Sequence, residues 1–285
     1  MYNLNLMYLT NKESIARIAE KSGVDWIFVD LEVNGKYQRQ GHLNTVISKH
    51  QIEDVSKIKK VLNKSKLLVR VNPIYKGSEN EIKRVISDGA DIVMLPFFKQ
   101  KKEVARFLEL VDGKAKTCLL FETPEAVEQS EKILELDGID YAHIGLNDLH
   151  LGYNMNFMFE PLANGMVQAL IEKFKNKQIE YGFGGIARIG FGDLPSEWIV
   201  TEHYRLGSKM AILSRSFYQT NDNDDDAYIQ SVFEKGVQDV RKLEAELSEQ
   251  DLKFLEKNKR RLTSKIFSIS NEIYLKRIGK KVGVA

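Results

Sequence analysis

Two carboxylates in this sequence stand directly after short apolar runs. Glu122 follows the run Leu119–Phe121, and Asp148 comes just past the apolar stretch Tyr141–Ile144. If the two runs are neighbouring parallel strands, spaced about 4.8 Å apart, both carboxylates can hold one hard cation. Two carboxylates, with no cysteine or paired histidine in the set, favour Mg²⁺ or Mn²⁺, with water and substrate oxygens completing an octahedron.

Three further charged residues lie at the ends of other apolar runs. Asp30 and Glu32 lie on the same side of the segment "WIFVDLE", and Arg70 ends the segment "LLVR". A buried guanidinium costs free energy unless it meets an anion, and its planar fork suits a carboxylate or an enolate oxygen. Arg70 therefore contacts either a ligand or an internal ion-pair partner, Asp30 or Glu32.

Short apolar segments alternate with amphipathic helical patterns along most of the chain. We expect strands at Leu4–Leu9, Trp26–Leu31, Lys66–Val71, Asp91–Leu95, Thr117–Phe121, Tyr141–Ile144, Glu180–Phe183 and Lys209–Leu213. Each crossover between parallel strands must pass over the sheet, so this alternation predicts an α/β fold. Eight such units fit a (β/α)8 TIM barrel over residues 1–218, with a doubly wound open sheet as the alternative. A barrel would bring the charged strand ends together on one rim.

Residues 219–285 depart from this alternation. They contain an acidic stretch and then two helical patterns with apolar stripes. These helices lie beyond the eighth strand, and their apolar faces need a partner, either their own barrel or a neighbouring subunit. We expect a C-terminal helical extension that serves packing or the formation of a homo-oligomer.

Composition and charge exclude several classes of protein. Lys and Arg number 42 against 40 Asp and Glu, a formal net charge of +2. This balance disfavours binding to nucleic acid or to a membrane surface. The single cysteine, Cys118, lies in an apolar run and is expected to be a buried structural thiol. Without a secretory leader pattern or a membrane-length apolar run, the sequence predicts a cytoplasmic protein.

The glycine-rich stretch "GFGGIA", residues 182–187, resembles a dinucleotide-binding fingerprint only in part. The fingerprint should open a helix at once, whereas the next helical pattern begins only near Pro195. Glycines after the seventh strand of a barrel fit better as a close backbone approach to a ligand. Arg188, in the same loop, is a candidate contact for an anionic substrate, with an ordinary surface role as the alternative.

Five motifs together resemble the HpcH/HpaI aldolase and citrate lyase β-subunit family. They are "VDLE", "LLVRVN", "GADIVMLPFF", "FETPEAV" and "IGLNDL", and the resemblance covers roughly residues 10–215. Members of this family are metal-dependent (β/α)8 enzymes of the phosphoenolpyruvate/pyruvate superfamily.

The resemblance implies a role for each charged strand end. Glu122 and Asp148 would ligate one divalent cation, Mg²⁺ or Mn²⁺, and Arg70 would contact the keto or enolate oxygen of a pyruvate-like substrate. Asp30 and Glu32 would orient Arg70 and the metal's waters. Backbone N–H groups around Gly145, Leu146, Asn147 and Asp148 would receive the substrate carboxylate.

One departure from the family pattern concerns the acid–base group. In the pyruvate-aldolase branch a His directly follows the Glu of the second-strand motif, and here that position is Val33. The long loop after it contains Lys36, Arg39, His42 and His50. His42 is the better candidate replacement, and a metal-bound water is the other possible base. The loop is a candidate lid.

These observations predict a divalent-metal-dependent carbon–carbon lyase. It would form or cleave a 2-keto acid of the pyruvate or oxaloacetate type through a metal-stabilised enolate, with an aldehyde or acyl compound as acceptor. No Schiff-base lysine is required, and the strand interiors "LLVRV" and "TCLLFE" contain none. The alternatives are an ester lyase acting on citryl- or malyl-CoA-type thioesters, and a protein that binds metal and keto acid without catalysis.

Overall fold

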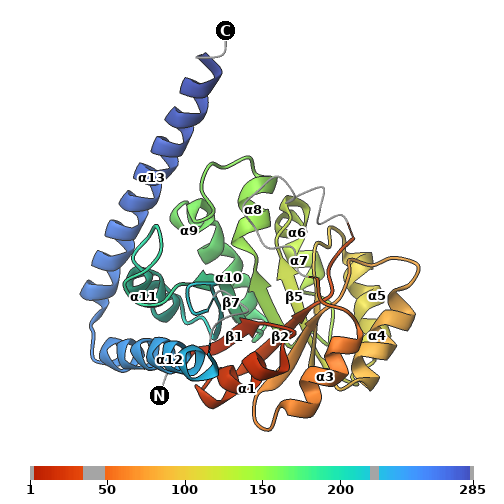
Figure 1. The fold of residues 1–285 in the computed structure, drawn as a ribbon. Helices are drawn as coiled ribbons and strands as arrows, with labels where there is room; N and C mark the ends of the chain where they lie inside the picture. Colours follow the sequence, from red (N-terminus) through yellow and green to blue (C-terminus); the bar gives the residue numbers. More distant parts are fainter. Residues whose placement is uncertain (1–2, 35–48, 219–224, 283–285) are drawn as a thin grey trace.

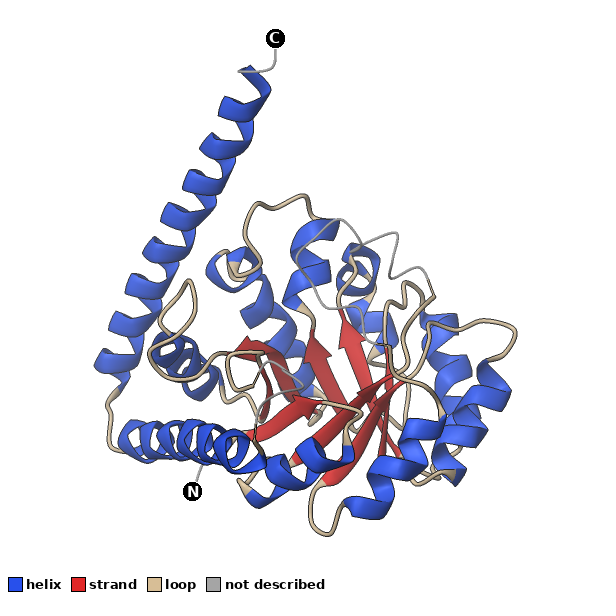
Figure 2. Cartoon of the chain, viewed as in Figure 1, coloured by secondary structure: helices blue, strands red, loops and turns tan. Residues whose placement is uncertain are grey.

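A closed barrel of eight parallel strands forms the centre of the molecule (Figures 1 and 2). The computed structural model describes residues 3–34, 49–218 and 225–282. The strands are β1 (Asn5–Leu9), β2 (Trp26–Asp30), β3 (Lys66–Arg70), β4 (Ile92–Leu95), β5 (Lys116–Phe121), β6 (Tyr141–Ile144), β7 (Glu180–Ile186) and β8 (Met210–Leu213). Each pairs with its sequence neighbour, and β8 closes on β1. The predicted TIM barrel is therefore confirmed, and the open-sheet alternative is wrong.

Helices surround the barrel on its outer face (Figure 2). They are α1 (Glu13–Lys21), α3 (Glu53–Val61), α4 (Ser78–Ser87), α5 (Lys101–Val111), α6 (Pro124–Glu128), α7 (Ser130–Ile133), α8 (Leu146–Gly152), α9 (Glu160–Ala163), α10 (Met166–Asn176) and α11 (Ser196–Leu206), followed by α12 (Asp226–Ser248) and α13 (Leu252–Val282). No helix among the described residues combines the length and the apolar character needed to cross a bilayer.

The alternation of side chains along each strand produces two apolar cores. In β2, Trp26 and Phe28 belong to the cluster inside the barrel, whereas Ile27 and Val29 pack against the outer helices. Cys118 is completely buried in the inner cluster, and burial raises the pKa of its thiol, as expected for a structural cysteine. The inner cluster fills the barrel below its C-terminal rim, so a ligand that enters the barrel at this rim would lie above the cluster.

A β-bulge in β7 explains the glycines of "GFGGIA". The pairing of β7 with β8 shifts register between Gly182 and Gly185. A Cβ on Gly182 would lie 2.2 Å from the Met210 carbonyl oxygen, and one on Gly185 would lie 2.8 Å from that of Ile212. Gly182 and Gly185 therefore make a close approach to the backbone of β8 possible. Gly184 and Gly185 also line the cavity at the C-terminal rim, so a close approach to a ligand at these glycines stays a prediction.

The C-terminal helices pack against the barrel of their own chain. Glu244 of α12 accepts a hydrogen bond from the Leu4 N–H at 2.6 Å, and Arg241 donates to the Leu4 carbonyl at 2.8 Å. Asn258 of α13 donates to the Trp198 carbonyl of α11 at 2.9 Å. The distal part of α13 extends past the barrel (Figure 1). A homo-oligomer that uses this part stays a prediction.

Two buried histidines make the stability of the barrel depend on pH. The His143 Nε2 lies 3.0 Å from the Gly184 carbonyl, and His203 stacks on Phe183 with ring centroids 3.8 Å apart. Burial lowers the pKa of His143 from 6.5 to about 4 and that of His203 to about 3. The unfolded chain therefore binds more protons at mildly acidic pH. Stability present above about pH 6.5 is lost as the pH falls toward 4.

Replacing His203 by Phe should reduce this pH dependence. Phenylalanine keeps the stacking on Phe183 but cannot take up a proton. The slope of the unfolding free energy against pH should fall by up to ~1.4 kcal/mol per pH unit, the contribution of one proton. Urea titrations at several pH values between 6.5 and 4 measure the slope for both proteins. Equal slopes would show that His203 contributes nothing to acid sensitivity.

Candidate active site

A cavity of about 650 Å³ opens at the C-terminal ends of the strands. Its inner end is apolar, and its polar groups come from strand ends and from the loops that follow them. The lining residues are Phe28, Arg70, Met94, Leu120, Glu122, His143, Gly145, Leu146, Asn147, Asp148, His150, Asn156, Phe157, Met158, Gly184, Gly185, Asp193, Ile212, Ser214 and Arg215. No lysine is among them, so the described lining offers no Schiff-base nucleophile.

Arg70 is fixed at the cavity by a bidentate ion pair with Asp30. The two residues are register partners at the ends of β3 and β2. Arg70 Nε donates to Asp30 Oδ1 at 2.8 Å and Nη2 donates to Oδ2 at 2.9 Å, while Glu32 Oε2 lies 3.5 Å from Nε. Burial alone would lower the pKa of Arg70, but attraction to Asp30 and Glu32 raises it. Arg70 is therefore a permanent, oriented cation at the cavity.

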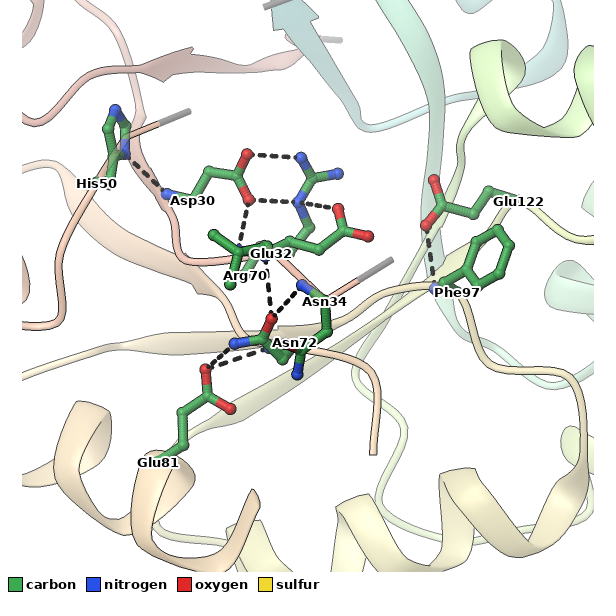
Figure 3. Close-up of polar contacts among 10 residues, drawn as sticks. Asp30, Glu32, Asn34, His50, Arg70, Asn72, Glu81, Phe97 and Glu122 are labelled. Atoms are coloured by element: carbon green, nitrogen blue, oxygen red, sulfur yellow. Dashed lines mark hydrogen bonds and ion pairs between the residues drawn. The ribbon is translucent and has the colours of Figure 1, made fainter. Parts of the chain in front are cut away.

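A second group of hydrogen bonds fixes the chain where it leaves β2 (Figure 3). Asn72 Oδ1 accepts from the N–H groups of Val33 and Asn34, both at 3.0 Å. Asn72 in turn donates to Glu81 Oε1 at 2.8 Å. The side-chain amide of Asn72, in the loop after β3, thereby fixes the backbone next to Glu32 and keeps Glu32 beside Arg70.

Glu122 enters the cavity from the junction between β5 and α6. Thr123 caps α6 by accepting from the Ala126 N–H at 3.1 Å, so the chain turns directly after Glu122. Phe97 donates its N–H to Glu122 Oε1 at 3.0 Å (Figure 3). Phe97 does so with a φ of 48°, a left-handed conformation that is unfavourable for a bulky residue. Strained backbone of this kind is typical of functional sites.

Negative charge accumulates around Glu122. Burial raises the pKa of its carboxyl well above the usual range, and repulsion from Glu32 and Asp148 adds to this effect, against the attraction of Arg70 and the Phe97 N–H. Glu122 and Asp148 are 3% and 9% exposed and together line both the main cavity and an adjoining one of about 430 Å³. A cation between them would relieve the repulsion, so the donor set fits a hard divalent ion.

Gly145, at the start of α8, leaves the space that Glu122 occupies. A Cβ at position 145 would lie 2.8 Å from both Cβ and Oε2 of Glu122. Gly145→Ala should therefore displace the carboxylate and weaken Mn²⁺ binding by ~10–100-fold without removing a charge. Calorimetric titration tests this against Gly279→Ala, a position on α13 with open space around it. Equal Mn²⁺ affinity in the two variants would contradict it.

The sequence model of the HpcH/HpaI aldolase/citrate lyase family matches residues 5–171. The chain belongs to this family. A search of curated proteins finds no match.

Solved structures of HpcH/HpaI aldolases share the fold. An HpcH/HpaI aldolase from Desulfitobacterium hafniense DCB-2 superposes with a TM-score of 0.59 at 16% identity, covering 84% of this chain and 93% of that one. An HpcH/HpaI aldolase/citrate lyase family protein from Burkholderia cenocepacia J2315 gives 0.60 at 14% identity, covering 84% and 95%. Membership of the HpcH/HpaI family indicates a lyase.

The structure brings together most of the residues that the sequence singled out. Arg70, Glu122 and Asp148 line one cavity, and Leu146 and Asn147 lie beside them. Asp30 and Glu32 stand behind Arg70 and are 1% exposed. His42 lies outside the described residues, so its role stays a prediction.

Two sequence-based expectations need correction. The Gly145 N–H donates to the Phe121 carbonyl at 3.0 Å and extends the pairing of β6 with β5, so it is not available for a substrate carboxylate. Arg188 does not line the cavity: its guanidinium lies over the Phe191 ring, 4.3 Å from the centroid. Arg215, which follows β8, lines the cavity instead, and no motif in the sequence singled it out.

Two further residues at or near the cavity carried little signal in the sequence. His143, like Tyr141, faces the inside of the barrel from β6, and it pairs in register with Leu120 and Gly182. A polar side chain in an otherwise apolar strand was the one feature of the sequence that indicated a residue of the site here. His50 accepts a hydrogen bond from the Asp30 N–H through Nδ1 at 3.0 Å, a contact to backbone that no sequence pattern indicates.

Proposed function

We propose that this protein is a divalent-metal-dependent carbon–carbon lyase that forms or cleaves a 2-keto acid of the pyruvate or oxaloacetate type. The observation that supports this most directly is the convergence of Glu122, Asp148 and Arg70 on one cavity of a barrel that belongs to the HpcH/HpaI family. A divalent cation held by the two carboxylates, together with the guanidinium, would bind an α-keto carboxylate and stabilise negative charge on its keto oxygen.

Glu122 and Asp148 are the residues that we propose to hold Mg²⁺ or Mn²⁺. No group of three or more acidic, His or Cys side chains with metal-binding geometry occurs among the described residues. The protein would thus contribute two ligands, and Mg²⁺ typically keeps several waters and substrate oxygens. When bound, such an ion supplies Lewis-acid stabilisation of negative charge on the substrate.

Arg70 has the second role in this proposal. Asp30 engages two of its five N–H groups, which fixes the plane of the guanidinium at the edge of the cavity. The remaining face of Arg70 would donate hydrogen bonds to the keto oxygen and hold it during the reaction. The backbone at Leu146 and Asn147, in the first turn of α8, would receive the substrate carboxylate, since N–H groups there have no intrahelical acceptor.

The acid–base group must come from outside the second-strand motif. Val33, which follows Glu32, is 54% exposed, and its N–H donates a hydrogen bond to Asn72 Oδ1. Its aliphatic side chain cannot transfer a proton. His42, in the loop that follows, stays our candidate for this step.

Proton exchange at the methyl group of pyruvate tests the proposal without requiring a known acceptor. In D₂O with Mn²⁺ or Mg²⁺, the wild-type protein should exchange these protons, and removing the metal with EDTA should stop the exchange. Aldehydes and CoA esters, offered separately as acceptors, distinguish an aldolase from a thioester lyase. Tight keto-acid binding with no exchange under any of these conditions would instead show a binding protein.

A further inference from the structure

Glu81 is a buried carboxylate that lies outside the main cavity. It belongs to the first turn of α4 and is 8% exposed, and it is not among the residues that line the cavity with Arg70 and Glu122. The other acidic residue of that turn, Glu79, is exposed and pairs with Lys83 at 2.6 Å. Burial disfavours the charge of Glu81 and raises the pKa of its carboxyl, so a specific partner must favour a carboxylate at this position.

Asn72 is the partner of this carboxylate. Glu81 Oε1 accepts hydrogen bonds from the backbone N–H of Asn72 at 3.2 Å and from its side-chain Nδ2 at 2.8 Å. Asn72 is 7% exposed and comes two residues after Arg70, in the loop that follows β3. Helix α4 is therefore joined to the chain just beyond the strand end that carries Arg70.

The two ends of the Asn72 side chain have opposite hydrogen-bonding requirements. The oxygen Oδ1 only accepts hydrogen bonds, and it accepts them from the N–H groups of Val33 and Asn34, both at 3.0 Å (Figure 3). The nitrogen Nδ2 only donates. If the amide turned over, Nδ2 would face two N–H donors and Oδ1 would face a carboxylate oxygen. Glu81 therefore selects the orientation in which the amide can hold Val33 and Asn34.

The backbone of Glu32 is held on both sides. On one side, the Glu32 N–H donates to Asp30 Oδ1 at 3.1 Å, and the same oxygen accepts from Arg70 Nε. On the other side, the Asn72 amide holds the next two N–H groups of the chain. Between these contacts, Glu32 Oε2 lies 3.5 Å from Arg70 Nε, and its negative charge repels that of Glu122. The direction of the Glu32 carboxylate therefore depends on the orientation of the Asn72 amide.

We propose that Glu81 is a positioning residue of the active site, which acts through the Asn72 amide to hold Glu32 beside Arg70. Its effect on catalysis rests on the lyase function proposed above, because Glu32 can influence the reaction only if the ion and the keto acid bind next to it. The proposal extends the site to α4, although none of the described side chains of this helix lines the main cavity.

A reciprocal pair of substitutions tests the selection of the amide orientation. Asn72→Asp keeps an oxygen for the N–H groups of Val33 and Asn34 but places a second carboxylate against Glu81. It should lower kcat for pyruvate proton exchange with Mn²⁺ by at least ~10-fold, the lower end of what groups behind a metal site typically contribute. Adding Glu81→Gln supplies an amide that can donate to the introduced carboxylate, so the double variant should regain most of the lost rate.

Two leucine variants on α4 separate this role from the general stability of the helix. Glu81→Leu removes the acceptor of Asn72, whereas Glu79→Leu removes an exposed carboxylate from the same turn and is the matched control. Glu81→Leu should speed hydrogen–deuterium exchange of the Val33 and Asn34 amides by ~3–10-fold, the effect of losing one hydrogen bond. It should also lower kcat for pyruvate exchange, with KM changed less than ~2-fold. Glu79→Leu should match the wild type in both measurements.

These measurements distinguish the positioning role from the lyase function. If wild-type protein does not exchange pyruvate protons, the lyase function is wrong, and amide exchange in Glu81→Leu still decides whether Glu81 fixes the backbone beside Glu32. If the wild type does exchange pyruvate protons, two results would overturn the positioning role. One is that Glu81→Leu matches Glu79→Leu in amide exchange and in kcat, and the other is that adding Glu81→Gln leaves Asn72→Asp as slow as before.

Discussion

Glu122→Gln should reduce Mn²⁺ affinity by more than ~100-fold and reduce pyruvate proton exchange to the background rate. The amide is nearly isosteric with the carboxylate and can still accept from the Phe97 N–H, so the fold should be retained. It removes, however, one of the two anionic ligands on which the proposed ion depends. Replacing groups behind a metal ligand typically costs 10–100-fold in affinity, so loss of the ligand should cost more.

A matched control lies three residues along the chain. Glu125 is partly exposed on α6 and forms an ion pair with Lys99 at 2.9 Å, so Glu125→Gln removes an equal charge near the site without removing a ligand of the proposed ion. Isothermal titration with Mn²⁺ and NMR exchange of pyruvate should leave this variant close to wild type. Retention of tight Mn²⁺ binding in Glu122→Gln would remove the basis of the functional proposal.

Arg70→Met should cause the second large effect, on both stability and activity. It leaves Asp30 and Glu32, each 1% exposed, without their cation. Breaking one side of a buried ion pair costs ~3–5 kcal/mol of unfolding free energy. Pyruvate exchange should fall by at least ~100-fold, because removing one oriented donor from an oxyanion costs ~10²–10³ in rate.

A double variant separates the structural role of Arg70 from its proposed chemical role. Adding Asp30→Leu to Arg70→Met replaces the buried pair by apolar groups and should restore part of the lost stability. It should restore no pyruvate exchange, because the guanidinium is still missing. If the double variant regained activity along with stability, Arg70 would be a structural ion-pair residue and not a catalytic one.

The sequence was most informative where a charged residue ends an apolar strand. Such a residue needs a partner, and parallel strands end at the same rim, so Asp30, Arg70 and Glu122 could be placed together from the pattern alone. The sequence could not decide which partner Arg70 contacts: Asp30, Glu32 and a ligand were all expected as candidates. The structure shows the bidentate contact with Asp30 and leaves Arg70 at the cavity.

Contacts made through backbone were not predictable in the same way. The N–H of Phe97 that reaches Glu122, and the amide of Asn72 that fixes Val33, depend on loop conformation and carry no signature in residue type. Gly145 shows the converse case. The family resemblance assigned it a role through its N–H, whereas in the structure it lines the cavity and its missing side chain makes room for Glu122.

Glycine patterns were only a partial guide. The stretch 182–187 was expected to approach a ligand because barrel enzymes bind ligands after the seventh strand, and Gly184 and Gly185 do line the cavity. The packing of Gly182 and Gly185 against the backbone of β8 depends on the bulge in β7 and had no signal in the sequence. Arg188, which comes after the bulge, does not line the cavity, whereas Arg215 does.

A crystal structure with Mn²⁺ and oxalate, a mimic of the pyruvate enolate, would test the central claim most directly. We predict an anomalous Mn²⁺ peak within about 2.3 Å of carboxylate oxygens of both Glu122 and Asp148. Oxalate should complete the coordination, with an N–H of Arg70 within hydrogen-bond distance of one of its oxygens. Mn²⁺ bound elsewhere, or bound at this cavity without either carboxylate, would contradict the account.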